Sequence, residues 1–121
     1  MGSQQSVLVI HNVMTQRETW QVLLEVFGGM NTIGAYLDEA MAQFAAHKGE
    51  IAAIVVGICF EELCPITESL VARLRDKYKG PMVVASRLQV FRERLRVCGC
   101  NHDCDNGDVL DVVKDILEVR V

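Results

Sequence analysis

The sequence lacks any long apolar run, and none of its 121 residues lie in a stretch near the roughly 18–20 that a membrane-spanning helix needs. It also lacks the charged segment followed by a short apolar one that marks a secretory signal. Basic residues are not in excess, since twelve Lys and Arg stand against sixteen Asp and Glu. These absences predict a soluble, cytoplasmic protein that has no contact with a membrane and binds no nucleic acid directly.

Internal repeats, low-complexity stretches and linkers are also absent from the sequence. The length fits one domain, because about 100–200 residues per domain is usual. We expect residues 1–5 to be a disordered N-terminus or an expression remnant, and residues 6–121 to form the domain. The five cysteines are an odd number in a chain large enough to fold without disulfides, so we expect reduced thiols.

Short apolar runs alternate with helical patterns along the whole domain. Trp20, Leu23, Leu24 and Phe27, for example, have the spacing of a helix face that packs into a core. Strands are predicted at residues 6–10, 32–36, 51–59, 82–85 and within 98–105, and helices are predicted to begin near Thr15, Asp38, Pro65, Leu88 and Asp108. Such alternation predicts an α/β fold with a doubly wound parallel sheet, covered by helices on both faces.

Ligands of doubly wound domains bind beyond the carboxyl ends of the strands, so these loops discriminate between families. The first loop, which begins with His11 and Asn12, has neither the Ser/Thr-rich phosphate loop of flavodoxins nor the cysteine of tyrosine phosphatases. The layout instead resembles the receiver (CheY-like) family of response regulators. The resemblance rests on the order and lengths of the elements, on Asp38 to Met41, on Pro81, and on Ser86 at the end of the fourth strand.

The receiver resemblance implies a flavodoxin-like (βα)5 fold with strand order 2-1-3-4-5. It also implies a pocket with two Mg²⁺-binding acids, a phosphoacceptor Asp, a Ser or Thr, and a Lys. The corresponding positions here hold His11 and Asn12, then Gly57 (or Cys59 if the register slips by two), then Ser86, and finally Asn106. Only Ser86 matches the family pattern.

This degenerate pocket changes the expected chemistry. Mg²⁺ prefers oxygen ligands, and neither Gly nor Cys can form an aspartyl phosphate. We therefore expect an atypical receiver, or pseudo-receiver, that needs no cofactor and is not phosphorylated. By resemblance it would act through contacts with a protein partner or with an effector domain of the same polypeptide, for example as the regulatory domain of a transcription activator. No base–nucleophile pair can be placed, so we expect no enzymatic activity.

Eight of the twelve basic residues lie between positions 73 and 96. Ordinary receivers self-associate through the face made by the fourth helix, the fifth strand and the fifth helix. That face would combine the basic Arg92 and Arg96 with the acidic Asp111 and Asp115, an arrangement that can pair with itself across a two-fold axis. We therefore expect a homodimer.

The cysteines suggest an alternative function. Three thiols and an imidazole lie within residues 98–104, although their spacing matches no familiar zinc pattern. In a receiver layout the mouth of the sheet would gather His11, Cys59, Cys64 and Cys104. A thiol- or metal-responsive sensor is therefore the alternative hypothesis, and a small ligand in the emptied pocket is a third.

Overall fold

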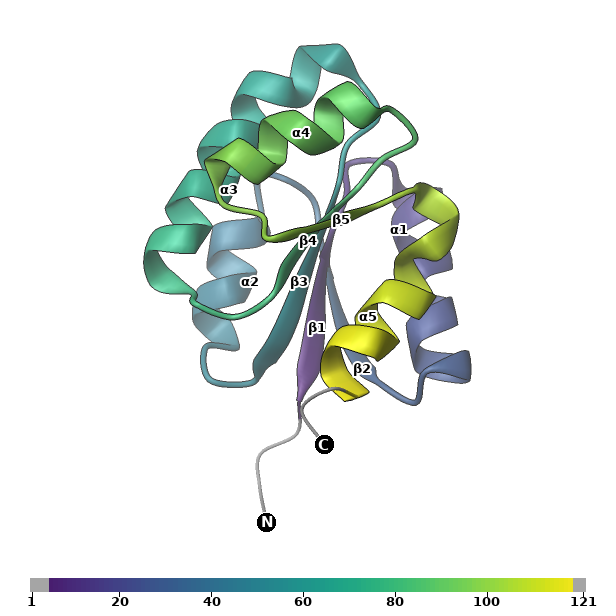
Figure 1. Ribbon diagram of the computed structural model, residues 1–121. Coiled ribbons are helices and arrows are strands. Elements are labelled where there is room, and N and C mark those ends of the chain that lie inside the picture. Colours follow the sequence, from purple (N-terminus) through teal and green to yellow (C-terminus); the bar gives the residue numbers. More distant parts are fainter. Residues whose placement is uncertain (1–4, 119–121) are drawn as a thin grey trace.

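The computed structural model describes residues 5–118, so the predictions for residues 1–4 and 119–121 lie outside the described part. Five strands form one parallel sheet in the order β2-β1-β3-β4-β5 (Figure 1). The strands are β1 (Ser6–Ile10), β2 (Asn31–Ala35), β3 (Ile51–Gly57), β4 (Met82–Ala85) and β5 (His102–Cys104). This architecture confirms the predicted fold class and strand order.

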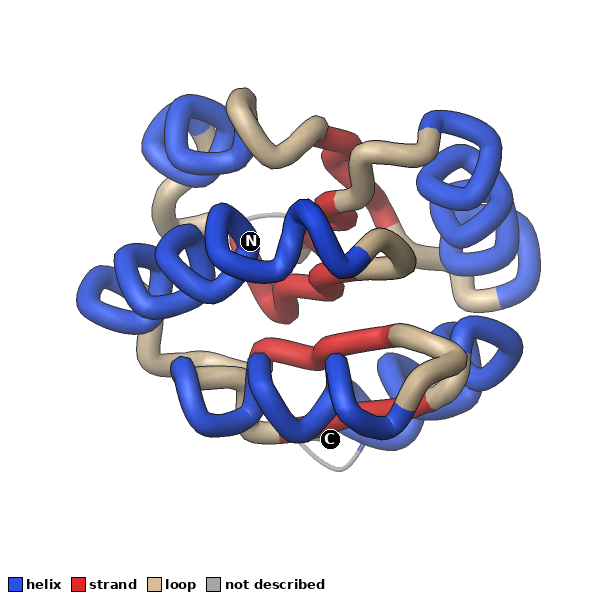
Figure 2. Tube along the Cα trace, turned by 90° about the horizontal axis from the view of Figure 1, so that it is seen from above, coloured by secondary structure: helices blue, strands red, loops and turns tan. Residues whose placement is uncertain are grey.

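Helices cover both faces of the sheet (Figure 2). On one face lie α1 (Met14–Val22), which continues into a π-helical turn at Leu23–Phe27, and α5 (Val109–Glu118). On the other lie α2 (Ala40–Ala46), α3 (Cys64–Lys77) and α4 (Gln89–Cys98). None of the described helices is long and apolar enough to cross a membrane.

The central strands are apolar along their whole length because both faces of the sheet are covered. All five residues of β1 are buried, and so are six of the seven in β3. Since side chains alternate across a strand, Leu8 and Ile54 pack with the helices α2 to α4, whereas Val9 and Val55 pack with α1 and α5. Trp20 of α1 is the largest side chain that is fully buried.

The first helix differs from its prediction at both ends. It begins at Met14, one residue before the predicted start near Thr15, and the N–H of Val13, the residue before the helix, donates a hydrogen bond to Nδ1 of His11. Phe27, expected in the core, is 66% exposed. The wider π-helical turn ends the 3.6-residue spacing that placed Phe27 beside Trp20.

The fifth strand is shorter than predicted. Cys98 closes α4, and Gly99 follows with a φ of 149°, a conformation that glycine adopts readily. Only His102–Cys104 pair with β4. The three thiols and the imidazole of residues 98–104 therefore do not lie on one strand, since Cys98 belongs to a helix.

Candidate functional site

The carboxyl ends of β1, β3 and β4 bring the receiver-like positions to one edge of the sheet (Figure 1). His11 and Asn12 follow β1, Gly57 is the last residue of β3, and Ser86 follows β4. Cys59 lies two residues beyond β3 and is exposed. His11 and Ser86 are buried, whereas Asn12 is exposed.

The imidazole of His11 is neutral and held in place. Its Nδ1 accepts a hydrogen bond of 2.9 Å from the N–H of Val13, so the ring proton lies on Nε2. Burial, and to a smaller extent the charge of Arg17, lowers the pKa of His11 to about 4. The ring packs edge-on against Trp20, with 5.2 Å between the ring centroids.

No side chain fits at Gly57 without a rearrangement. A Cβ placed on this residue would lie 2.1 Å from Cδ2 of His11 and 2.6 Å from Cζ3 of Trp20. Carbon atoms in contact lie about 3.5–4.0 Å apart, so two aromatic rings already occupy the space into which an acceptor side chain would extend.

Trp20 also ties this edge to the turn after β5. Its indole N–H donates a 3.0 Å hydrogen bond to the carbonyl oxygen of Asn106. Asn106 begins a short 3₁₀ turn, Asn106–Asp108, that leads into α5. One side chain therefore links α1, the end of β3 and the start of α5.

Little space remains at this edge. The cavity there has a volume of about 10 Å³ and is lined by residues that include His11, Asn12, Gly57 and Cys59. This volume holds at most about one water molecule. This hollow is therefore too small for a phosphoryl group.

The receiver fold implies a Mg²⁺ ion at this edge, and the residues present do not fit one. Mg²⁺ prefers an octahedron of oxygen ligands that includes carboxylates. His11 offers a nitrogen that is already hydrogen-bonded, and the Oδ1 of Asn12 accepts the N–H of Leu37 at 2.9 Å. Neither position supplies a carboxylate.

The cysteines do not form a metal centre either. Within residues 5–118 no group of three or more His, Cys, Asp or Glu side chains is placed to hold a metal ion. Burial raises the pKa of Cys104 to about 12 and that of Cys100 to about 12, which keeps both thiols protonated. Protonated thiols are poor ligands and poor nucleophiles.

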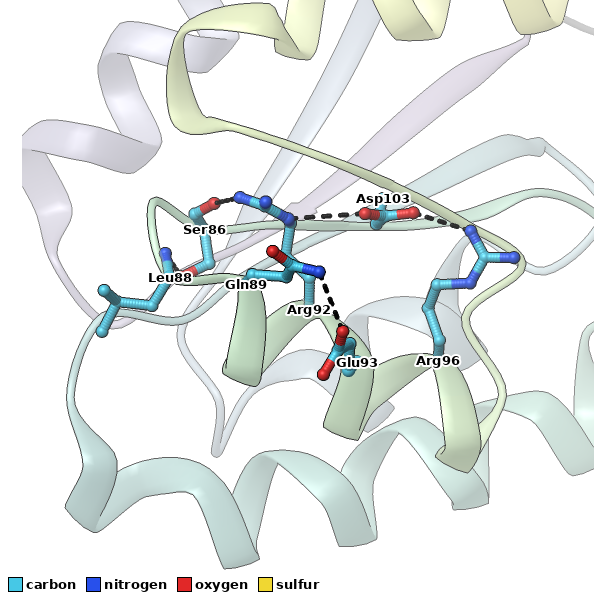
Figure 3. Close-up of polar contacts among 7 residues, drawn as sticks. All are labelled: Ser86, Leu88, Gln89, Arg92, Glu93, Arg96 and Asp103. Carbon is cyan, nitrogen blue, oxygen red and sulfur yellow. Dashed lines mark hydrogen bonds and ion pairs between the residues drawn. The ribbon is translucent and has the colours of Figure 1, made fainter.

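Arg92 and Arg96, which the sequence predicts at an interface with another copy of the chain, form ion pairs with an acidic residue of their own chain. Arg96 donates to Asp103 of β5 at 2.7 Å, and Arg92 forms an ion pair with the same carboxylate at 3.4 Å (Figure 3). Arg92 also donates to the carbonyl oxygen of Ser86 at 2.6 Å. The Oγ of Ser86 accepts the N–H of Leu88. These contacts hold α4 against β4 and β5.

The roles of two residues in this region could not be predicted from the sequence. The sequence assigns no role to Asp103, although the alternation of side chains along β5 places it opposite to Cys104 and thus toward α4. Trp20 was recognised only as a core residue. Its contact with Gly57 joins positions 37 residues apart in sequence, and no local pattern indicates it.

The fold matches solved receiver structures. The chain is similar to a putative two-component response regulator with a GGDEF domain (22% identity, TM-score 0.79), over 96% of this chain and 50% of that one. It is similar to a LuxR family DNA-binding response regulator from Silicibacter pomeroyi (19%, 0.71), over 95% and 93%. It is also similar to a signal receiver domain from Bermanella marisrubri (14%, 0.76), over 95% and 99%.

No family model and no curated protein matches the sequence. The chain spans half the length of the GGDEF-containing protein. At these identities the shared property is the CheY-like fold.

The depressed pKa of His11 predicts a pH-dependent stability. The unfolded chain takes up this proton near pH 6.5 and the folded chain only near pH 4, so the free energy of unfolding should fall as the pH drops between these values. The full loss is about 3 kcal/mol, at about 1.4 kcal/mol per pKa unit. Urea denaturation from pH 7 to 4 should show this loss in the wild type and a flatter curve in His11→Gln. Parallel curves would contradict the burial of a neutral imidazole.

Proposed function

We propose that this chain is an atypical receiver domain that acts as a phosphorylation-independent module for protein interaction. The observation that carries the proposal is the filled space at Gly57, where His11 and Trp20 stand in the place of an acceptor side chain. In this proposal the receiver fold serves as a rigid scaffold, and the residues at the modified edge prevent the phosphorylation that usually controls a receiver.

Three requirements of aspartyl phosphorylation are unmet at this edge. Gly57 has no carboxylate to attack the phosphoryl donor, His11 and Asn12 are unsuited to Mg²⁺, and the cavity of about 10 Å³ leaves no room for the group. The position after β5 offers Asn106 in place of a lysine, and its carbonyl oxygen is bonded to Trp20. We therefore assign the domain no catalytic activity and no cofactor.

The similar structures indicate what such a domain works with. One carries a GGDEF domain, another is a LuxR family DNA-binding response regulator, and a third is a CheY6 bound to the P1 domain of CheA3. By analogy, we propose that this domain contacts an effector domain of the same polypeptide or a separate protein, and that regulation of transcription is one such use. The scattered, protonated thiols make a metal or redox sensor the weaker explanation.

Native mass spectrometry in the presence of acetyl phosphate and Mg²⁺ tests the proposal. We expect the intact mass to stay constant, because the chain offers no acceptor at the edge of the sheet. A receiver domain with an intact Asp pocket, treated in parallel, should gain the mass of one phosphoryl group. The same gain on this chain, located by peptide mapping to this edge, would contradict the proposal.

We also propose that the module self-associates through α4, β5 and α5. Arg92 and Arg96 share Asp103, which leaves their cluster with excess positive charge, and Asp111 and Asp115 of α5 are exposed. Within the described residues neither α5 carboxylate forms an ion pair. A two-fold axis would bring α5 of one copy near α4 of the other.

Reversal of the α5 charges tests this assembly. Asp111→Lys together with Asp115→Lys should weaken a dimer by roughly tenfold or more, since attraction to α4 becomes repulsion. The matched control is Glu61→Lys with Glu62→Lys, which changes the net charge equally on another surface. Sedimentation velocity over a range of concentrations reports the dissociation constant. If both double variants dimerise like the wild type, this face is not the interface.

A further inference from the structure

A long groove lies between α2 and α3, away from the surface assigned above. The two helices are neighbours on the same face of the sheet (Figure 1). Two adjoining hollows of about 350 and 470 Å³ share Leu37, Asp38 and Ile66, so they form one continuous groove. It begins at Asn12 and Leu63, beside the filled receiver pocket.

The floor of the groove is apolar. Leu37 and Leu70 pack into the core below, and Met41 is half-buried beside them. Ile66 on the rim is different, since 58% of it is exposed, whereas Thr67 and Leu70 of the same helix are buried. An isolated exposed isoleucine is ordinary, but this one borders a hollow that is already lined by aliphatic side chains.

Two opposite charges mark different points of the groove. Asp38 lies where the two hollows meet, and Arg73 lies at the far end, two helical turns along α3 from Ile66. Within residues 5–118 neither side chain takes part in a hydrogen bond or an ion pair, although Glu68 on the same helix as Arg73 is paired with Arg94 of α4 at 2.7 Å. Both side chains are exposed and accessible to a partner.

We propose that this groove docks a short amphipathic helix of a protein partner. Two helical turns span about 11 Å, which matches the distance along α3 from Ile66 to Arg73, seven positions further on. Apolar residues of the partner helix would cover Ile66 and Met41, an acidic residue would meet Arg73, and a basic one would meet Asp38. This is helix-in-groove recognition. The inference rests on the proposed function, since it names a surface through which a contact module works.

The direction of the partner helix follows from electrostatics. Acidic residues are favoured in the first turn of a helix and basic residues in the last. The N-terminus of the partner helix would therefore lie at Arg73 and its C-terminus at Asp38. Because α3 starts near Asp38 and runs toward Arg73, the partner helix is antiparallel to α3.

The larger hollow beside β5, about 520 Å³ in volume, is a weaker candidate for this docking site. It is lined by residues that include His102, Asp115 and Ile116, and so belongs to the α4–β5–α5 surface already assigned to self-association.

A pair of synthetic peptides tests the docking site. Each is an amphipathic helix of about 15 residues with leucines at i, i+3, i+4 and i+7. The first peptide has Glu in its first turn and Arg in its last, and the second has these charges exchanged. Titration of ¹⁵N-labelled protein, followed by amide chemical shifts, yields both the site and the dissociation constant.

We expect the first peptide to bind at least about fivefold more tightly than the second, with shifts along α2 and α3. In Asp38→Arg with Arg73→Glu the preference should reverse. The control Glu18→Lys with Lys48→Glu exchanges two exposed charges outside the groove and outside the proposed dimer surface, and it should keep the wild-type preference. Equal affinities, an unreversed preference, or shifts confined to other helices would overturn the proposal.

The remaining outcomes separate this inference from the proposed function. Shifts along α2 and α3 that grow with protein concentration alone would identify a second copy as the occupant and overturn the partner helix. If the peptide does not bind and acetyl phosphate does not modify the chain, the docking groove is wrong but the proposed interaction module is not contradicted. If the peptide binds and the chain also accepts a phosphoryl group, the docking groove is supported and the proposed independence from phosphorylation is wrong.

Discussion

The contact of His11 and Trp20 with Gly57 determines what the carboxyl edge of this sheet can do. In a parallel α/β sheet this edge is where ligands bind, because the loops there diverge and leave a crevice. Here two aromatic rings fill the crevice, and the Cβ of any other residue at position 57 would overlap His11. The indole then bonds to Asn106, so the same packing also fixes the turn into α5. The low pKa of the buried His11 and the lack of room for a side chain at position 57 both reflect this packing.

Because this edge is closed, we propose that the functional surfaces lie on the sides of the domain. On one side, Asp103 holds Arg92 and Arg96 and thereby attaches α4 to β5. On another, the groove between α2 and α3 has an aliphatic floor and two unpaired charges. Most of these side chains lie on regular elements, which hold their positions better than loops do, whereas Leu37 and Asp38 lie in the turn before α2. The scaffold is consistent with a module that presents fixed surfaces for other proteins to bind.

Much of the fold follows from the sequence, because buried parallel strands are continuous apolar runs and residues 51–57 are an unbroken example. The receiver-like positions also follow from the sequence, because each lies at or just after the end of a predicted strand. Long-range contacts were not accessible in this way. Neither the overlap of Trp20 with position 57 nor the pairing of Asp103 with α4 has a local signature. The start of β5 has no clear sequence signal either, because Gly99 ends a helix inside the cysteine-rich stretch.

The most direct test is a measurement of proton–proton distances at Gly57 in solution. Nuclear Overhauser effects should connect the Hα protons of Gly57 to Hδ2 of His11 and to Hζ3 and Hη2 of Trp20, since these ring carbons lie closest to its missing Cβ. Their presence, unchanged by Mg²⁺ and acetyl phosphate, is the result that the filled edge predicts. If these effects are absent, or vanish when the phosphoryl donor and Mg²⁺ are added, the edge is open and the account of this domain as a phosphorylation-independent module is wrong.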